Sequence, residues 1–406
     1  MEPGNAPAST VLALFAKVTA DDLNNLADRS SKMLQRIRDS MLQPHPRKEP
    51  PIFPSNKVQA LCGIDKTKMS NLLKAGKLPQ GTQDGKGKMR RFTLAETIEW
   101  VDATLKPRKR AKGQKGKIVT VGNFKGGVTK TTTGMNLAQG LALRRCRRVL
   151  HIDLDPQGST TTLYGINPNA EVDHGQTVLP LIEGAEKDLR YAPMKTYWQN
   201  LDLIPASADL FNAEFILPAQ VHHGDAGFEF WQVLRNGIEP LLDEYDYIVI
   251  DTAPTLSYLT INALFAADSM IVPVIPDVLS YSSMVQFWTL FADLVNGMKR
   301  FAGKGPTKSF DSIEVLISRM PSKQTAQVVR DWIRKTYGDY VCPVEIPETE
   351  LARTSSTEFK TIYDMPNYEG AEAYRRIREP YDNLVDLVDD RTCRMWEYEE
   401  QQAAAV

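Results

Sequence analysis

A glycine-rich turn between an apolar strand and a helix restricts the fold of this chain more than any other feature. The run KIVTVGN at 117–123 is apolar enough for a buried strand, the turn FKGGVTKTT follows at 124–132, and a helical pattern occupies 131–145. Such a unit directs backbone N–H groups and a helix N-terminus at phosphate oxygens. Lys130 would then reach the β- and γ-phosphates of a nucleotide, and the Thr131 hydroxyl would coordinate Mg²⁺.

Strands and helices alternate from residue 118 onward. Further strands are predicted at 148–153, 201–204, 246–251, 269–275 and 313–319, with a helix at 324–337 among the connections. Apolar strands separated by helical segments are typical of a parallel sheet covered on both faces. The predicted fold class is therefore α/β, with a mostly parallel sheet.

The turn departs from the common GxxxxGK[ST] pattern at two positions. Phe124 replaces the first glycine and Thr129 replaces the glycine before the lysine, while Lys125 adds a second lysine. Two further motifs accompany it: LHIDLDPQGS at 150–159 and YIVIDTAP at 247–254. Carboxylates at strand ends on one sheet edge suit a site for a metal and a nucleotide.

These motifs together resemble the deviant phosphate loop KGGxxK[ST] and the partner motifs of the ParA/MinD family of ATPases, over roughly residues 115–385. The resemblance implies a P-loop NTPase fold, with ATP, ADP and Mg²⁺ as ligands. It also implies that Lys125 reaches the partner's phosphates across an ATP-sandwich dimer. Thr129 stands where the family has glycine, which would raise the conformational cost of the loop.

The resemblance assigns roles to individual residues. Those expected to act in catalysis are Lys125, Lys130, Asp155 and Asp251, with Asp155 orienting the attacking water. Those expected to coordinate the metal are Thr131, Asp153 and Asp251. Those expected to contact the nucleotide are Lys125, Gly126, Gly127, Val128, Thr129, Lys130, Thr131, Thr132, Arg319, Met320 and Pro347.

The pattern of residues 55–105 predicts a winged helix-turn-helix. Two short helices, 55–61 and 66–74, are joined by a turn containing Gly63, and a glycine-rich cationic loop precedes a strand at 89–93 and a helix at 94–105. In such motifs the N-terminal half of the second helix reads base edges. The residues expected to contact DNA are Lys66, Thr67, Lys68, Ser70, Asn71, Lys86, Lys88 and Arg90. A basic helical subdomain without sequence readout is the alternative.

Charge is distributed unevenly along the chain. Residues 56–117 hold sixteen Lys or Arg against five acids, a net charge of +11, so the remainder carries −12. A basic block in a near-neutral chain favours a polyanionic partner. The stretch 107–117 is either a solvated basic linker or a contact to phosphates. Arg375, Arg376 and Arg378 either contribute to a non-specific DNA surface or form a solvated helix face.

Residues 1–45 are predicted to form a helical arm, because apolar residues recur at near-helical spacing from Leu23 to Leu42, with Thr19 or Asp21 as cap. The arm would serve in dimerisation; packing onto its own chain is the alternative. The predicted organisation is thus an arm (1–45), a winged helix-turn-helix (46–106), a basic linker (107–117) and an ATPase domain (118–406).

An N-terminal region of about 115 residues before the phosphate loop resembles the large plasmid-type (type Ia) ParA proteins. This implies a DNA partition ATPase that dimerises on ATP, binds non-specific DNA, is stimulated by a ParB-type centromere-binding protein and represses its own operon. A nucleotide-gated repressor without a transport role is the alternative.

The acidic C-terminus argues against membrane binding, and four dispersed cysteines argue against a disulfide scaffold. A cytoplasmic, nucleoid-associated protein is expected.

Overall fold

In the computed structural model the chain forms two compact units, residues 1–47 and 48–406. The residues that the structure describes are 17–42, 47–83, 90–223, 228–301, 308–351, 359–366 and 371–404.

The first unit contains helix α2 (Ala20–Leu42). Thr19 and Asp22 cap its start reciprocally: the Asp22 N–H donates to Thr19 Oγ1 at 3.3 Å, and the Thr19 N–H donates to Asp22 Oδ2 at 2.9 Å. The large apolar side chains of α2 are exposed within this unit, namely Leu23, Leu26, Met33, Leu34 and Ile37. The predicted helix is present, with Thr19 rather than Asp21 as the cap, and no described residue of this unit covers its apolar stripe.

The second unit begins with a small helical module and a three-stranded antiparallel sheet of order β1-β3-β2. Its elements are β1 (Phe53–Pro54), α3 (Ser55–Cys62), α4 (Lys66–Lys74), β2 (Thr82–Gln83), β3 (Arg90–Phe92) and α5 (Leu94–Leu105). Gly63, at φ +59°, ends α3, and the Asp65 carboxylate caps α4 by accepting from the Lys68 N–H at 2.7 Å. Trp100 and Phe92 are buried in its core.

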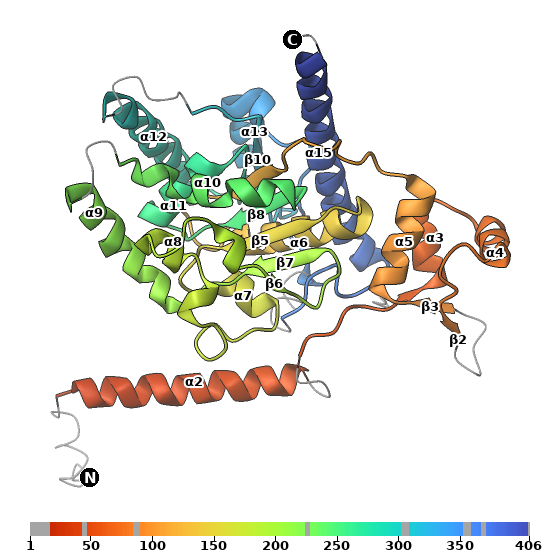
Figure 1. The fold of residues 1–406 in the computed structure, drawn as a ribbon, viewed down its shortest axis with the longest axis horizontal. Coiled ribbons are helices and arrows are strands. Elements are labelled where there is room, and N and C mark those ends of the chain that lie inside the picture. Colours follow the sequence, from red (N-terminus) through yellow and green to blue (C-terminus); the bar gives the residue numbers. More distant parts are fainter. Residues whose placement is uncertain are drawn as a thin grey trace, which may run out of the picture. The chain divides into compact units, whose positions relative to one another are not determined.

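A seven-stranded sheet of order β10-β9-β4-β8-β5-β7-β6 forms the rest of this unit, and β6 alone among these strands runs antiparallel to its neighbour (Figure 1). Its strands are β4 (Lys117–Val121), β5 (Val149–Asp153), β6 (Met194–Lys195), β7 (Leu201–Ile204), β8 (Tyr247–Asp251), β9 (Ser269–Val274) and β10 (Ser312–Ile317). The six predicted strands lie within one or two residues of those observed, and the parallel α/β class is confirmed.

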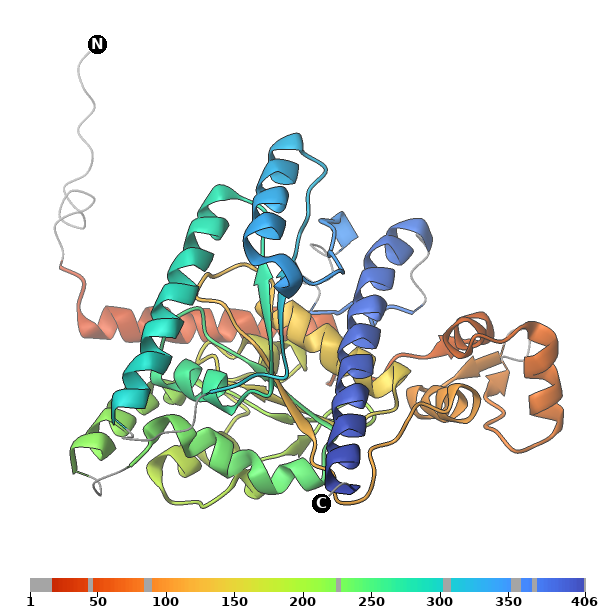
Figure 2. The same ribbon diagram turned by 90° about the horizontal axis from the view of Figure 1, so that it is seen from above.

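Helices cover both faces of this sheet (Figure 2). The helices are α6 (Lys130–Arg144), α7 (Ser159–Leu163), α8 (Leu179–Glu183), α9 (Ala213–His223), α10 (Val233–Ile238), α11 (Tyr258–Ala266), α12 (Val278–Phe301), α13 (Gln324–Tyr337) and α15 (Ala371–Ala404). One buried cluster joins the strands to α6 and α15, and a second joins them to α8, α10 and α11. Gly140 permits the close approach of α15 to α6, because a Cβ there would lie 2.4 Å from Val385 Cγ2.

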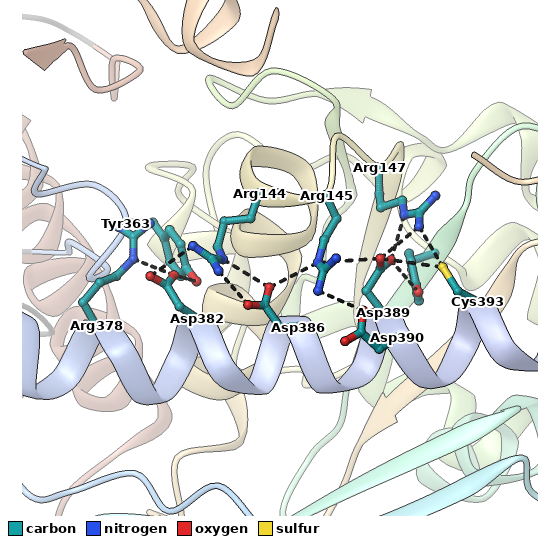
Figure 3. Close-up of polar contacts among 11 residues, drawn as sticks. Arg144, Arg145, Arg147, Tyr363, Arg378, Asp382, Asp386, Asp389, Asp390 and Cys393 are labelled. Carbon is teal, nitrogen blue, oxygen red and sulfur yellow. Dashed lines mark hydrogen bonds and ion pairs between the residues drawn. The ribbon is translucent and has the colours of Figure 1, made fainter. Parts of the chain in front are cut away.

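A ladder of ion pairs fixes α15 against the end of α6 (Figure 3). Arg144 pairs with Asp386 at 2.7 Å, and Arg147 forms a two-pronged pair with Asp389 at 2.7 and 2.9 Å. The Arg147 and Asp389 side chains are 3% and 1% exposed, and the Tyr247 hydroxyl also donates to Asp389. Burial alone would lower the pKa of Arg147, but the hydrogen bonds and charge of Asp389 outweigh it and raise that pKa.

The basic linker 107–117 is held by acidic residues of the second unit. Arg108 pairs with Glu397 and Glu400 of α15, Arg110 with Asp246 at 3.2 Å, and Lys117 with Glu399 at 2.6 Å. Most of the positive charge that the sequence places here is therefore balanced within the fold. None of the helices in the described part of the chain is long and apolar enough to cross a membrane.

Candidate nucleotide site

A cavity of 490 Å³ opens where β4, β5 and β8 end and α6 begins. Its lining comes from the glycine-rich turn, from the loops after β5, β8 and β10, and from α15. The lining residues are Gly126, Gly127, Thr129, Lys130, Thr131, Thr132, Asp155, Ser159, Pro254, Arg319, Ile346, Pro347, Glu348, Thr349, Ile377 and Tyr381. The carboxyl edge of a parallel sheet is where ligands bind in open α/β folds.

The turn holds left-handed backbone at two positions. Gly127 has φ +74°, which glycine adopts without cost, whereas Thr129 has φ +73° directly before α6. A β-branched residue in this region is strained. The departure from glycine at position 129 therefore coincides with a conformation that favours glycine.

Lys130 is enclosed by the turn. Its Nζ donates to the Lys125 carbonyl oxygen at 2.9 Å, and the residue is 7% exposed. Burial lowers the pKa of Lys130, while the charges of Asp251 and Asp155 act in the opposite direction. The turn thus folds around a cation that is close enough to Asp251 and Asp155 to be influenced by their charges.

Two buried carboxylates end neighbouring strands next to this cation. Asp153 and Asp251 are paired in register, and both are fully buried. The Thr131 hydroxyl donates to Asp251 Oδ2 at 2.7 Å, whereas Asp251 Oδ1 is buried without a hydrogen-bond partner among the described residues. Burial raises the pKa of both carboxyls, and the charge of Asp251 adds to the rise at Asp153. A hydroxyl and an unpartnered carboxylate oxygen are hard oxygen donors that fit Mg²⁺.

Lys125 was predicted to contact the nucleotide, but it does not line the cavity of its own chain. Its Nζ donates to Ser280 Oγ at 2.6 Å and lies 3.5 Å from Asp277 Oδ1, at the start of α12. The two lysines of the turn therefore point to different places.

Most of the remaining predicted nucleotide residues line the cavity, with two exceptions. Val128 is fully buried, and its carbonyl accepts from Ser318 Oγ at 3.2 Å. Met320 pairs with Pro347 through the backbone but does not line the cavity. The side chains of Asp153 and Asp251 lie behind the cavity wall rather than in it. No group of three or more His, Cys, Asp or Glu side chains in the described ranges could hold a metal.

Several residues of this site were not among the predicted site residues, including one threonine of α7 and two residues of α15. Ile377 and Tyr381 of α15 and Thr349 line the cavity, and Thr160 of α7 donates to Asp251 Oδ2 at 2.8 Å. Ile377 and Tyr381 are four residues apart, a spacing that predicts a shared helix face. The sequence does not indicate which surface that helix face contacts. The spacing alone therefore could not predict that Ile377 and Tyr381 line the cavity.

The five predicted DNA-contacting residues of α4 share its exposed surface: Lys66, Thr67, Lys68, Ser70 and Asn71. Arg90 instead donates to the Gln80 carbonyl at 2.7 Å, and Lys86 and Lys88 lie outside the described residues. Arg378, a candidate for a non-specific DNA surface, is buried over the Tyr363 ring and pairs with Asp382, so it belongs to the core.

A family model described as an AAA domain matches residues 116–300. Protein SopA of Escherichia coli is 28% identical over 83% of this chain and 87% of its own length. The sporulation initiation inhibitor protein Soj of Bacillus subtilis is 33% identical over 64% of this chain and 95% of its own.

Solved structures share the fold. A structure titled as a partition protein has a TM-score of 0.60 at 22% identity, covering 83% of this chain and 94% of that one. Cobyrinic acid a,c-diamide synthase of Mycobacterium smegmatis, with a bound ATP analog and magnesium, has a TM-score of 0.50 at 28% identity, covering 65% and 93%. With the deviant phosphate loop and its paired carboxylates, these similarities show that the chain belongs to the ParA/MinD family of P-loop ATPases.

Proposed function

We propose that this ATPase is a DNA partition protein that dimerises on ATP, binds non-specific DNA and is stimulated by a ParB-type centromere-binding partner. The observation that carries the proposal is the union, in one compact unit, of a two-lysine phosphate loop and a module with an exposed cationic helix. Its cofactors are ATP, ADP and Mg²⁺, and its DNA partners would make it a cytoplasmic, nucleoid-associated protein.

In the proposed hydrolysis, the residues in and next to the cavity have different roles. Lys130 binds the β- and γ-phosphates, backbone N–H groups of residues 126–132 surround them, and Asp155 orients the attacking water. Thr131, Asp251 and Asp153 would hold Mg²⁺, with Asp251 Oδ1, unpartnered among the described residues, as the oxygen free to bind it. The chemistry that bound Mg²⁺ supplies is neutralisation of charge on the phosphates. Arg319 and Pro347, which line the cavity, would contact the base.

A homodimer is part of the proposal, and the position of Lys125 supports it. Its ammonium contacts Asp277 and Ser280 and does not line its own cavity, so it would have to exchange these partners to reach a second copy's phosphates. Two nucleotides at one interface concentrate negative charge, which a second cation per site offsets. The exposed apolar face of α2 would provide a further dimer contact.

The module of residues 46–106 is proposed to be a winged helix-turn-helix that recognises the protein's own operator. Helix α4 would enter the major groove, and the β2–β3 hairpin would form the wing. An arm over residues 1–45 and a linker over 107–117 complete this organisation.

A nucleotide-gated repressor without a transport role is the second candidate. It is favoured by direct contact between the module and the phosphate-loop helix: Cys146 Sγ donates to the Ile98 carbonyl of α5 at 3.6 Å, two residues after α6 ends. A nucleotide-dependent shift of α6 would thus reach α5 without a partner protein.

Binding to random-sequence DNA with ATP, with ADP and without nucleotide, at several salt concentrations, tests the proposal. A partition ATPase binds tightly and salt-sensitively only with ATP, and a ParB-type partner accelerates its hydrolysis. The repressor would be favoured instead if the affinity for random DNA were the same with and without nucleotide while operator binding depended on the nucleotide.

A further inference from the structure

Thr160 joins the loop after β5 to the carboxylate that ends β8. It is the second residue of α7 and is fully buried, and its hydroxyl donates to Asp251 Oδ2 at 2.8 Å. A threonine hydroxyl has one hydrogen to donate, and here the carboxylate of the last residue of β8 accepts it.

The same oxygen of Asp251 also accepts from Thr131 Oγ1 at 2.7 Å. Two donors therefore occupy Oδ2, and Oδ1 is left buried without a hydrogen-bond partner among the described residues. Because the Thr131 hydroxyl donates its hydrogen to Asp251, the lone pairs of its oxygen remain available to a cation. The two threonines thereby determine which oxygens of this site are free.

The neighbouring carboxylate is fixed by the next residue of α7. Asp153 Oδ2 accepts from the N–H and the hydroxyl of Thr161, both at 2.8 Å, and Thr161 Oγ1 accepts from the Ala206 N–H at 2.9 Å. Asp153 Oδ1 accepts from the Asp155 N–H at 3.1 Å. The loop that carries Asp155 is therefore tied to Asp153 at both ends. The Leu154 N–H ties it to the Asp251 backbone carbonyl at 3.0 Å, and the Thr160 hydroxyl ties it to the Asp251 carboxylate.

We infer that Thr160 is a positioning residue, which orients the Asp251 carboxylate for Mg²⁺ and keeps the Asp155 loop in register with it. The inference rests on the proposed ATP and Mg²⁺ site. Thr160 touches neither nucleotide nor metal in this scheme, since it acts through Asp251. Outer hydrogen-bond partners of this kind commonly change metal affinity or activity by about 10–100-fold.

The test compares Thr160→Val, Thr160→Ser and a control, Thr162→Val. Thr162 lies on the same helix, but its hydroxyl donates to the Gly158 carbonyl at 2.9 Å, away from both carboxylates. Binding of a fluorescent ADP is measured in EDTA and over a Mg²⁺ titration. Thr160→Val should bind ADP in EDTA within about twofold of the unaltered protein but need roughly tenfold more Mg²⁺ to reach half of the metal-dependent gain. Thr160→Ser and Thr162→Val should resemble the unaltered protein.

Two outcomes would overturn the inference. One is an unchanged Mg²⁺ requirement in Thr160→Val. The other is an equal loss of ADP binding with and without Mg²⁺, or no rescue by serine, which would indicate a packing role only. If the unaltered protein itself bound neither ADP nor ATP in the presence of Mg²⁺, the proposed function would fail instead, and the two failures are thus distinguishable.

Discussion

At the scale of the residue, the two lysines of the phosphate loop have different surroundings. Their substitutions should therefore affect different steps, namely ATP binding by the monomer and ATP-dependent dimerisation. Lys130→Ala removes a cation enclosed by the turn and should weaken ATP binding by roughly 100-fold, since hydrogen bonds to charged groups are worth about 1.5–3 kcal/mol each. Lys125→Ala should spare binding by the monomer but prevent the ATP-dependent dimer.

Fluorescent-nucleotide binding and sedimentation with ATP measure the two effects, and exposed Lys187→Ala is the control. Normal dimerisation and hydrolysis in Lys125→Ala would contradict the proposed role of the deviant loop.

Thr129 is a second residue with a definite prediction. Its φ of +73° costs a β-branched residue about 1–2 kcal/mol, which glycine avoids at the expense of greater freedom in the unfolded chain. Thr129→Gly should therefore stabilise the nucleotide-free protein by about 0.5–1 kcal/mol in urea unfolding. Thr132→Gly, inside α6, should instead destabilise it slightly, by about 0.3 kcal/mol, because glycine has a lower helix propensity than threonine. A destabilised Thr129→Gly variant would show that the threonine side chain stabilises the loop.

The buried acid pair predicts a pH dependence. Burial, with the charge of Asp251, raises the pKa of Asp153 to about 8, from 3.8 in an unfolded chain. Between these values the native state binds more protons, so its free energy of unfolding falls as pH rises, by up to about 1.4 kcal/mol per pH unit. The stability that protonation provides is complete below pH 3.8 and is lost as pH passes 8.

Asp153→Asn should flatten this part of the profile, measured without Mg²⁺ from pH 5 to 8, while exposed Asp209→Asn should leave it unchanged. Parallel profiles for Asp153→Asn and the unaltered protein would mean that Asp153 is ionised throughout.

At the scale of the element, the Arg147–Asp389 pair is the most deeply buried of the ion pairs that α15 forms among the described residues. Asp389→Asn would leave the Arg147 guanidinium buried without its counter-charge, at a cost of about 3–5 kcal/mol. Asp390→Asn is the matched control one residue along: its pair with Arg145 has a 58% exposed carboxylate, and its loss should cost less than about 1 kcal/mol. Thermal or urea unfolding measures both, and equal costs would contradict the burial argument.

At the scale of the whole molecule, we expect the two proposed modes of DNA binding to use different surfaces. A Lys66→Ala/Lys68→Ala variant should lose operator binding but keep ATP-dependent binding to random DNA, because α4 lies in the module and not at the nucleotide cavity. Lys74→Ala, at the far end of the same helix, is the control. Loss of both modes together, in filter binding at matched salt, would mean that a single surface serves both.

The sequence alone determined the features that depend on local order along the chain. The strands of the main sheet are short apolar runs, so their positions could be predicted within a residue or two, and α5 and α13 match their predicted bounds. The phosphate loop, Asp153 and Asp251 were recognisable because the site forms where loop and strand ends meet at one sheet edge.

Only the tertiary structure decided which distant surfaces meet. It brought Ile377 and Tyr381 to the cavity wall, turned Arg378 into the core and paired the cations of the 107–117 linker with Asp246 and the acidic end of α15. It also directed the Thr160 hydroxyl to Asp251. The physical reason is that periodicity shows which face of an element is apolar or charged, whereas the partner of that face is set by packing between segments far apart in the chain.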